Sequence, residues 1–214
     1  MIKIISKFIM SGLFFLSFVA NAEEVIKNYG NLGIPYGLIT ESHESNIIIN
    51  ENKITILANK GTDLYTNSDG SNSTDNAPRL FFEPKSDFTF SAKVTANFTT
   101  AYDGGALYFY ADTDNWGKLL FERFKSGNNG IASTVTRSTG DDAYHNLVEN
   151  NEIHLRIARK NNKFTFFYSE DGDHWSYLRS FSLVSPKAIK VGFIAQSPIS
   201  QKHKVVYSNI LFEE

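Results

Sequence analysis

From residue 46 onward, apolar and polar residues alternate with a period of two, and turn residues separate the alternating segments. A period of two places successive side chains on opposite faces of a β-strand. We therefore expect an all-β chain that folds as an antiparallel β-sandwich of two sheets. The pattern predicts strands over residues 46–49, 53–58, 79–82, 88–98, 105–111, 117–124, 131–137, 153–159, 164–169, 175–181, 190–195 and 205–212.

Two of these segments indicate which faces are buried. In segment 88–98 the even-numbered residues are apolar and the odd-numbered ones are mostly polar, so we expect the even side to face the core. In segment 105–111 both sides are apolar or aromatic, and Tyr108 and Tyr110 share one of them. We expect that strand to be central and covered on both faces, or to line a groove with its tyrosines.

Two charged residues in segment 117–124, Lys118 and Glu122, share one side of their strand, opposite an apolar side. Two interpretations follow. The pair lies on a solvated sheet, where opposite charges on one face stabilise each other. Alternatively, the pair converges with Tyr108 and Tyr110 as the floor of a ligand cleft.

The N-terminus has the composition of an export signal. It begins with two lysines, continues with an apolar run over residues 8–19, and ends in a triplet with small residues at its first and third positions. The apolar run is shorter than the roughly 20 residues that span a bilayer, and no later segment is apolar enough to do so. We expect residues 1–22 to be a signal peptide cleaved after Ala22, and residues 23–214 to form a single secreted or periplasmic domain.

Composition narrows the possible functions further. The chain contains no cysteine, which excludes a disulfide framework, a thiolate metal site and a thiol nucleophile. Its formal net charge of −2 argues against nucleic-acid binding, because such proteins normally present a basic stripe. An exported domain without disulfides must be stabilised by core burial. We therefore expect Tyr108, Tyr110 and Trp116, on polar faces, to be the aromatic residues available for recognition.

Residues 61–78 predict a loop, because they combine several Asp and Asn residues with glycine. A loop so rich in oxygen atoms could bind Ca²⁺, although it lacks the acidic alternation of an EF-hand. The alternative, which we favour, is a solvated loop whose Asp and Asn side chains cap its own turns. No other cofactor is indicated.

Standard catalytic signatures are absent from the sequence, including the zinc-protease, phosphate-loop and nucleophile-elbow motifs. No strand carries the closely spaced carboxylates that polysaccharide-cleaving enzymes use. His145 follows two aspartates in what we predict to be a polar loop, where a solvated ion pair is a simpler interpretation than a general base. Residues 169–175 resemble the Asp-box hairpin of sialidases loosely, and we interpret them as a structural turn.

Several motifs occur in order along the chain and resemble those of the regulation-of-enolase-like family, a domain of unknown function. They include Gly61-Thr62-Asp63, Asp103-Gly104-Gly105-Ala106-Leu107, Asn115-Trp116-Gly117-Lys118-Leu119, Leu155-Arg156-Ile157-Ala158-Arg159 and Val191-Gly192-Phe193-Ile194-Ala195-Gln196-Ser197. This resemblance implies a β-sandwich of the concanavalin A-like, jelly-roll type. A weaker likeness extends to the sandwich domain appended to some β-xylosidases. An exported protein would not meet the cytosolic enolase, so that role is not carried over.

Members of the wider superfamily bind glycans on the concave sheet or its rim, and on this analogy the polar and aromatic residues in these motifs are the candidate ligand-binding set. A sugar would be held by fixed donors and acceptors while a ring covers its apolar face. The candidates are Arg79, Asp103, Tyr108, Tyr110, Trp116, Lys118, Glu122, Thr136, Arg137, Asp141, Asp142 and Gln196. The alternative is a buried ion-pair network that ties the two sheets together, formed by Arg79, Arg137, Asp103 and Glu122.

The sequence thus favours an exported, non-catalytic β-sandwich with a possible glycan ligand, no catalytic residue and no metal site. Two alternatives stay open. The first is a glycan-acting hydrolase that uses Glu122 with Asp103, Asp141 or Asp142. The second is a protein-interaction module with no small ligand. The oligomeric state is not indicated.

Overall fold

The computed structural model describes residues 24–26, 32–41 and 45–214. The expected signal peptide, residues 1–22, lies outside them. Within the described ranges the chain forms strands and turns, and no helix is long and apolar enough to cross a membrane.

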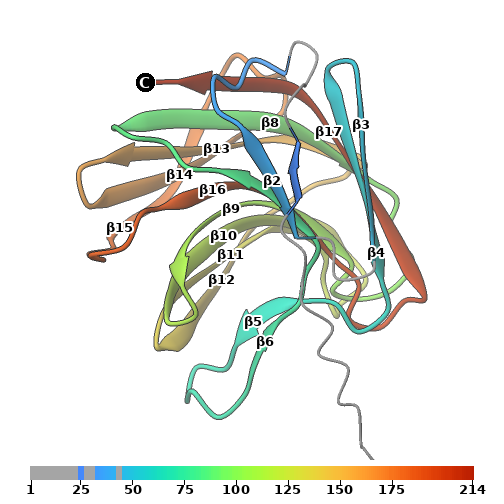
Figure 1. Ribbon diagram of the computed structural model, residues 1–214. Helices are drawn as coiled ribbons and strands as arrows, with labels where there is room; N and C mark the ends of the chain where they lie inside the picture. The colour runs from blue at the N-terminus through green and yellow to red at the C-terminus, as the bar shows by residue number, and fades with distance from the viewer. Residues whose placement is uncertain (1–23, 27–31, 42–44) are drawn as a thin grey trace, which may run out of the picture.

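Two large sheets pack face to face (Figure 1). The eight-stranded sheet contains, in spatial order, β1 (Glu24–Ile26), β2 (Leu38–Glu41), β7 (Arg79–Phe82), β16 (Lys190–Gln196), β9 (Gly104–Asp112), β10 (Asn115–Arg123), β11 (Asn129–Arg137) and β12 (Thr139–Leu147). The seven-stranded sheet contains β15 (Ser176–Ser182), β14 (Lys163–Ser169), β13 (Glu152–Lys160), β8 (Phe88–Ala96), β17 (Lys202–Glu213), β4 (Lys53–Asn59) and β3 (Asn46–Asn50). A separate hairpin pairs β5 (Leu64–Thr66) with β6 (Ser73–Asp75).

All pairings between these strands are antiparallel. The fold is therefore the all-β, antiparallel two-sheet sandwich that the sequence predicts. Each of the twelve predicted segments coincides with a strand, with ends that differ by at most three residues.

Five strands in the described residues were not predicted: β1, β2, β5, β6 and β12. The prediction of an unbroken loop over residues 61–78 is wrong, because β5 and β6 form a short hairpin there. The prediction of a loop around His145 is also wrong, since this residue lies in β12 at the edge of the eight-stranded sheet. An edge strand has one sheet neighbour and tolerates polar residues on both faces, so its alternation is weak.

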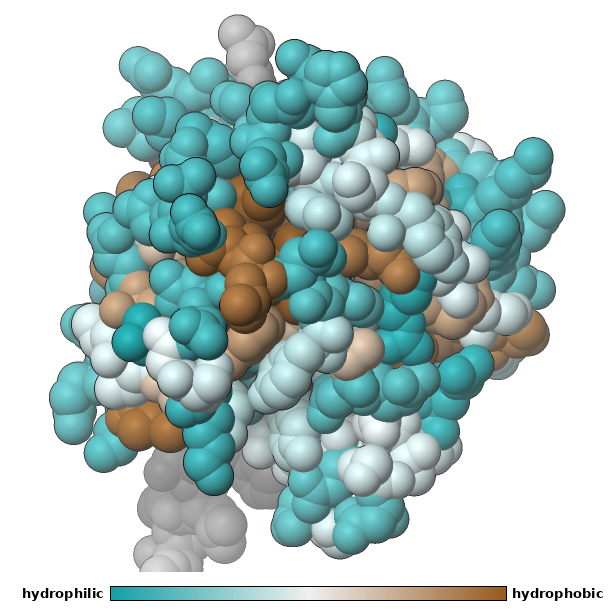
Figure 2. Space-filling view, turned by 180° about the vertical axis from the view of Figure 1, so that it is seen from behind, coloured by the Kyte–Doolittle hydropathy of each residue, from teal (hydrophilic) through white to brown (hydrophobic). Residues whose placement is uncertain are grey.

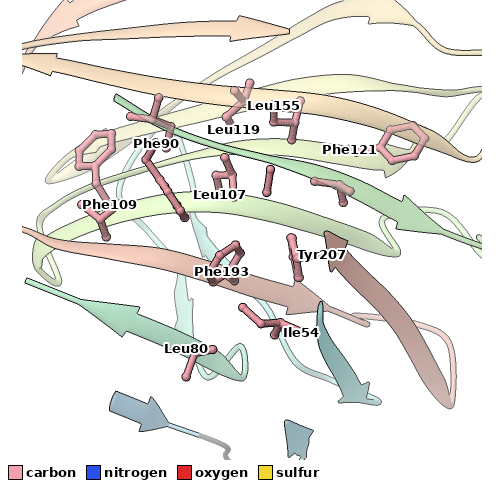
Figure 3. Close-up of a cluster of buried hydrophobic side chains, with 14 of the residues drawn as sticks. Ile54, Leu80, Phe90, Leu107, Phe109, Leu119, Phe121, Leu155, Phe193 and Tyr207 are labelled. Atoms are coloured by element: carbon pink, nitrogen blue, oxygen red, sulfur yellow. The ribbon is translucent and has the colours of Figure 1, made fainter. Parts of the chain in front are cut away.

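The main core lies between the two sheets and is rich in aromatic residues (Figure 3). Phe90 of β8 contacts Phe193 of β16 edge to face at 5.1 Å between ring centroids, and Phe109 of β9 stacks on Phe164 of β14 at 4.1 Å. Burial of each such ring stabilises the fold by about 1.5–3 kcal/mol. The surface seen in Figure 2 is by contrast mostly hydrophilic, with hydrophobic residues gathered near the middle of that face.

The second face of the eight-stranded sheet is also covered. Its apolar side chains form a smaller cluster that includes Tyr108, Trp116 and Leu120, together with Leu64 of the β5–β6 hairpin. Figure 1 shows this hairpin below the curved strands β9–β12. Strand β9 is therefore central and buried on both faces, as its two-sided apolar pattern predicts.

Candidate functional site

A pocket of about 320 Å³ opens on this second face of the eight-stranded sheet, beside the β5–β6 hairpin. Its volume lies within the range typical of ligand sites. Strands β10, β11 and β12 supply most of its lining, and the hairpin with its preceding residue, the end of β16 and two loops supply the remainder. The lining residues are Asp63, Tyr65, Tyr102, Lys118, Leu120, Glu122, Ala132, Ser133, Thr134, Asp142, Ala143, Tyr144, Gln196 and Pro198.

Lys118 lies in the floor of the pocket and is only 3% exposed. Its Nζ donates to Oε1 of Gln196 at 2.8 Å and to Oδ1 of Asp63 at 3.4 Å. The interpretation of Lys118 and Glu122 as a charge pair on a solvated sheet is therefore wrong. Both side chains are buried, and Asp63, next to the hairpin, is an ion-pair partner of Lys118.

Glu122 also lies in the pocket, and it is 5% exposed. It stands opposite Gly104 of β9 and Gly130 of β11, so no side chain flanks it on the neighbouring strands. Among the described residues, none donates a hydrogen bond to its carboxyl group or forms an ion pair with it. Burial raises the pKa of Glu122 to about 7, because desolvation penalises the charged form more than Lys118 favours it.

Asp142 on β12 reaches the pocket, whereas Asp141 does not. Asp142 accepts a hydrogen bond from Oγ1 of Thr134 at 2.5 Å. The next residue along a strand points to the opposite face, and Asp141 there pairs with Arg179 of β15 at 2.8 Å. Asp141 thus links the edges of the two sheets instead of contacting a ligand.

Gln196 joins the pocket floor to the rim. Its Oε1 accepts from Lys118, and its Nε2 donates to the backbone oxygen of Tyr102 at 2.9 Å. Tyr102 has a φ of +68°, which is uncommon for a bulky residue and is found mainly at turns and functional sites. Together with Tyr65 and Tyr144, it gives the pocket three aromatic rings.

Asp103 lies outside the pocket, although it follows Tyr102 directly. It is fully buried and accepts hydrogen bonds from Ser200 Oγ at 2.6 Å and from the backbone and side chains of Thr99 and Thr100. Burial alone would raise the pKa of Asp103, but these hydrogen bonds lower it. These contacts hold the loop that carries Tyr102, and Asp103, although predicted as a ligand contact, does not line the pocket.

Arg79 and its neighbours form a second polar cluster, away from the pocket. Its guanidinium pairs with Glu41 at 3.3 Å and with Asp75, and it lies over the ring of Tyr110. The hydroxyl of Tyr110 donates to Asp75 at 2.8 Å, and the ring of Tyr108 is fully buried. These three predicted residues do not line the pocket.

The remaining predicted residues on β10 and β11 are also excluded from the pocket. Trp116 is 1% exposed and cannot stack on a sugar, and the side chain of Thr136 is buried beside it. Arg137 is exposed and donates to the backbone oxygen of Ser182. The proposed ion-pair network is wrong as well, because no two of its four members pair with each other: Arg79, Arg137 and Asp103 have other partners, and Glu122 has none among the described residues.

The structure therefore brings together four of the predicted residues, Lys118, Glu122, Asp142 and Gln196. Sequence reasoning missed Asp63 and the three tyrosines. Asp63 belongs to a motif quoted above, and Tyr144 lies two residues after Asp142, on the same face of a strand. Tyr65 lies in the three-residue strand β5 and Tyr102 in a turn, and both segments are too short or too irregular for alternation to carry a signal.

No group of three or more metal-ligating side chains occurs in the described part of the chain. Asp69 and Asp75 of the 61–78 segment have protein partners, Ser71 and Arg79. In the 169–175 hairpin, Asp171 accepts from the backbone nitrogens of residues 173 and 174, which fits a structural turn. His145 contacts Ser133 at 2.9 Å, and burial lowers the pKa of its ring.

Comparison with known proteins supports the fold. The model of a family described as "Protein of unknown function (DUF1349)" matches residues 40–214. None of the curated protein sequences matches the chain. A functionally unknown protein from Saccharomyces cerevisiae has a similar structure, with a TM-score of 0.73 and 21% identity over 78% of this chain and 91% of that protein.

Two further structures are similar in fold. The carbohydrate-binding module CBM66 from Bacillus subtilis has a TM-score of 0.53 and 13% identity, over 84% of this chain and 96% of the module. The GH43 protein BlXynB from Bacillus licheniformis has a TM-score of 0.61 and 13% identity, over 82% of this chain and 36% of that longer protein. At these identities the likeness concerns the fold.

Proposed function

We propose that this chain, which belongs to the DUF1349 family of proteins of unknown function, binds carbohydrate in the pocket formed by Lys118, Glu122 and Gln196. The observation that carries the proposal is a pocket of about 320 Å³ that combines fixed polar groups with three tyrosine rings. The similar fold of a carbohydrate-binding module and of a GH43 protein also supports carbohydrate binding.

The chemistry of the pocket suits a sugar. The Lys118 ammonium and the Gln196 amide are held in place by each other, so little conformational entropy is lost when they meet a hydroxyl. The rings of Tyr65, Tyr102 and Tyr144 can cover the apolar face of a sugar. Export is part of this proposal, because the predicted signal peptide would bring the protein to glycans outside the cytoplasm.

Binding to a broad glycan array tests the proposal directly, and binding to at least one glycan class is expected. Tyr144→Ala should weaken that binding about fivefold, since a stacked ring contributes on the order of 1 kcal/mol. Tyr177→Ala is the matched control, because Tyr144 and Tyr177 are 63% and 61% exposed and Tyr177 lies outside the pocket. An array without any binding would contradict the proposal and favour a protein-interaction module.

A glycan-acting hydrolase is the second candidate, and one observation favours it. Glu122 has a pKa of about 7 and shares the pocket with Asp142, so the pair could act as general acid and base. Asp103 and Asp141 do not fit the second role, because neither lines the pocket. Release of reducing sugar by the wild type but not by Glu122→Gln would establish hydrolysis in place of binding alone.

A further inference from the structure

The charges around the pocket are unbalanced. Its lining contains three carboxyl groups, on Asp63, Glu122 and Asp142, and one ammonium group, on Lys118. Lys118 forms its ion pair with Asp63 at 3.4 Å. Among the described residues, no cation lies within 4 Å of the carboxyl group of Glu122 or Asp142.

The unpartnered carboxyl group of Glu122 is the more unusual of the two. The side chain is 95% buried, yet its carboxyl oxygens are not among the fully buried atoms that lack a partner, so they keep contact with the pocket opening. Glu122 shares the pocket lining with the apolar residues Leu120 and Ala132. A donor on a ligand in the pocket can therefore reach this carboxyl group, which has no hydrogen-bond donor or ion-pair partner among the described residues.

The aromatic residues favour the same kind of ligand. Tyr65, Tyr102 and Tyr144 line the pocket that contains the two carboxyl groups. The face of an aromatic ring carries partial negative charge and attracts ammonium groups. The tyrosine rings and the carboxyl groups together favour a cationic ligand whose carbon skeleton is apolar or carries hydroxyl groups.

We infer that the ligand is an amino sugar with a free, positively charged amine, and that this amine pairs with Glu122 and Asp142. The inference rests on the proposed carbohydrate binding and names the class of sugar. The tyrosine rings cover the sugar ring, and Lys118 and Gln196 contact its hydroxyl groups.

Two other sugar classes fit the pocket less well. An acidic sugar would place its carboxylate near Glu122 and Asp142, while the ammonium of Lys118 is already paired with Asp63. A neutral sugar offers only hydroxyl donors to Glu122, which compensate a buried carboxylate less than a charged donor does. The raised pKa of Glu122 is consistent with a site whose counter-ion arrives with the ligand.

Isothermal titration with three matched tetrasaccharides tests the inference. The probes are β-1,4-linked oligomers of glucosamine, N-acetylglucosamine and glucose, which differ at one substituent of each ring. The titration is run at about pH 6, where the sugar amine is protonated, and the bound amine in turn favours the charged form of Glu122. We expect the glucosamine oligomer to bind about tenfold or more tightly than either neutral oligomer.

Variants that remove one negative charge test whether Glu122 and Asp142 cause the preference for the glucosamine oligomer. Glu122→Gln should lower the affinity for the glucosamine oligomer about tenfold, and lower the affinity for a neutral oligomer by a clearly smaller factor, because a glutamine oxygen still accepts from a hydroxyl group. Asp142→Asn, at an exposed position, gives a second test if the first variant does not fold, and Glu149→Gln on the surface is the control. If a neutral oligomer bound as tightly as the glucosamine oligomer or more tightly, the amino-sugar inference would be overturned, whereas carbohydrate binding would stand. If no glycan bound, either in the titrations or on the array, the amino-sugar inference and the proposed carbohydrate binding would both be overturned.

Discussion

The Nζ of Lys118 lies 2.8 Å from Oε1 of Gln196, although their strands, β10 and β16, are separated by β9. The same amide donates to the backbone oxygen of Tyr102. One lysine therefore fixes a glutamine that fixes a loop at the rim of the pocket. This chain of contacts makes the floor and the rim depend on each other.

Replacement of Lys118 should weaken both the fold and the pocket. In Lys118→Met, Gln196 and Asp63 each lose a buried partner, and we expect the free energy of unfolding to fall by about 2 kcal/mol. Ligand affinity should fall as well, because the amide of Gln196 is no longer held in place. Urea denaturation measures the first effect and titration the second. The control is Lys125→Met, at an exposed position, which should change the free energy of unfolding by less than about 0.5 kcal/mol. If Lys118→Met and Lys125→Met lowered the free energy of unfolding equally, the prediction would be contradicted.

Stability should depend on pH through Glu122. Its pKa is raised from 4.5 to about 7, so between these values the folded state binds more protons than the unfolded state. This contribution is fully present below about pH 4.5 and is lost as the pH rises through about 7, a change on the order of 3 kcal/mol. Glu122→Gln should remove this loss and be more stable than the wild type at about pH 8.

The difference between the two proteins, measured by urea denaturation from about pH 5 to pH 8, isolates this effect. Burial lowers the pKa of His145, His154 and His203, which makes stability rise with pH in both proteins. The wild-type curve alone therefore mixes opposite slopes. Parallel curves for wild type and Glu122→Gln would show that Glu122 titrates near its ordinary pKa in the folded protein.

The sequence predicted the sheets well, because alternation reports directly which side chains share a face. It placed Lys118 and Glu122 correctly on one side of their strand, opposite the core. It could not show that this side is covered, because the cover is the β5–β6 hairpin, whose strands have three residues each. Contact between residues so distant in sequence leaves no periodic signal.

The candidate site was predicted in part for the same reason. Polar residues in the motifs included the four that meet in the pocket, but polarity alone did not separate them from Arg79 and Asp103, which have partners within the protein. Trp116 lies on the expected face and is nevertheless buried under neighbouring side chains. Whether an aromatic side chain is exposed depends on tertiary packing. The sequence alone therefore could not show whether Trp116 stacks on a ligand or belongs to the core.

Asp103 should act as a positioning residue for the pocket rim. Asp103→Ala removes the acceptor for Ser200, Thr99 and Thr100, and leaves their donors buried or partly buried. We expect a loss of about 3 kcal/mol in the free energy of unfolding, measured in urea. Affinity should also fall, because the loop that carries Tyr102 is released. Asp114→Ala, at an exposed turn, should change neither quantity, and an unchanged affinity in Asp103→Ala would contradict the positioning role.

Gly140 of β12 should control how the β5–β6 hairpin sits on the sheet. A Cβ atom at this position would lie 1.9 Å from the backbone oxygen of Thr66, whereas one at the exposed Gly37 would meet no atom within 4 Å. Gly140→Ala must therefore displace the hairpin, which we expect to cost about 2 kcal/mol of stability. Gly37→Ala should be neutral or slightly stabilising, since alanine reduces the freedom of the unfolded chain.

The same displacement should weaken ligand binding, because the hairpin brings Asp63 and Tyr65 to the pocket wall. Asp63 is also the ion-pair partner of Lys118, so its movement leaves the ammonium group in the floor without its carboxylate. Binding and stability should therefore fall together in Gly140→Ala and stay at wild-type levels in Gly37→Ala. If Gly140→Ala lost stability but bound a glycan with wild-type affinity, the hairpin would cover the sheet without forming a functional wall, and the site would be confined to strands β10–β12 and the loop of Tyr102.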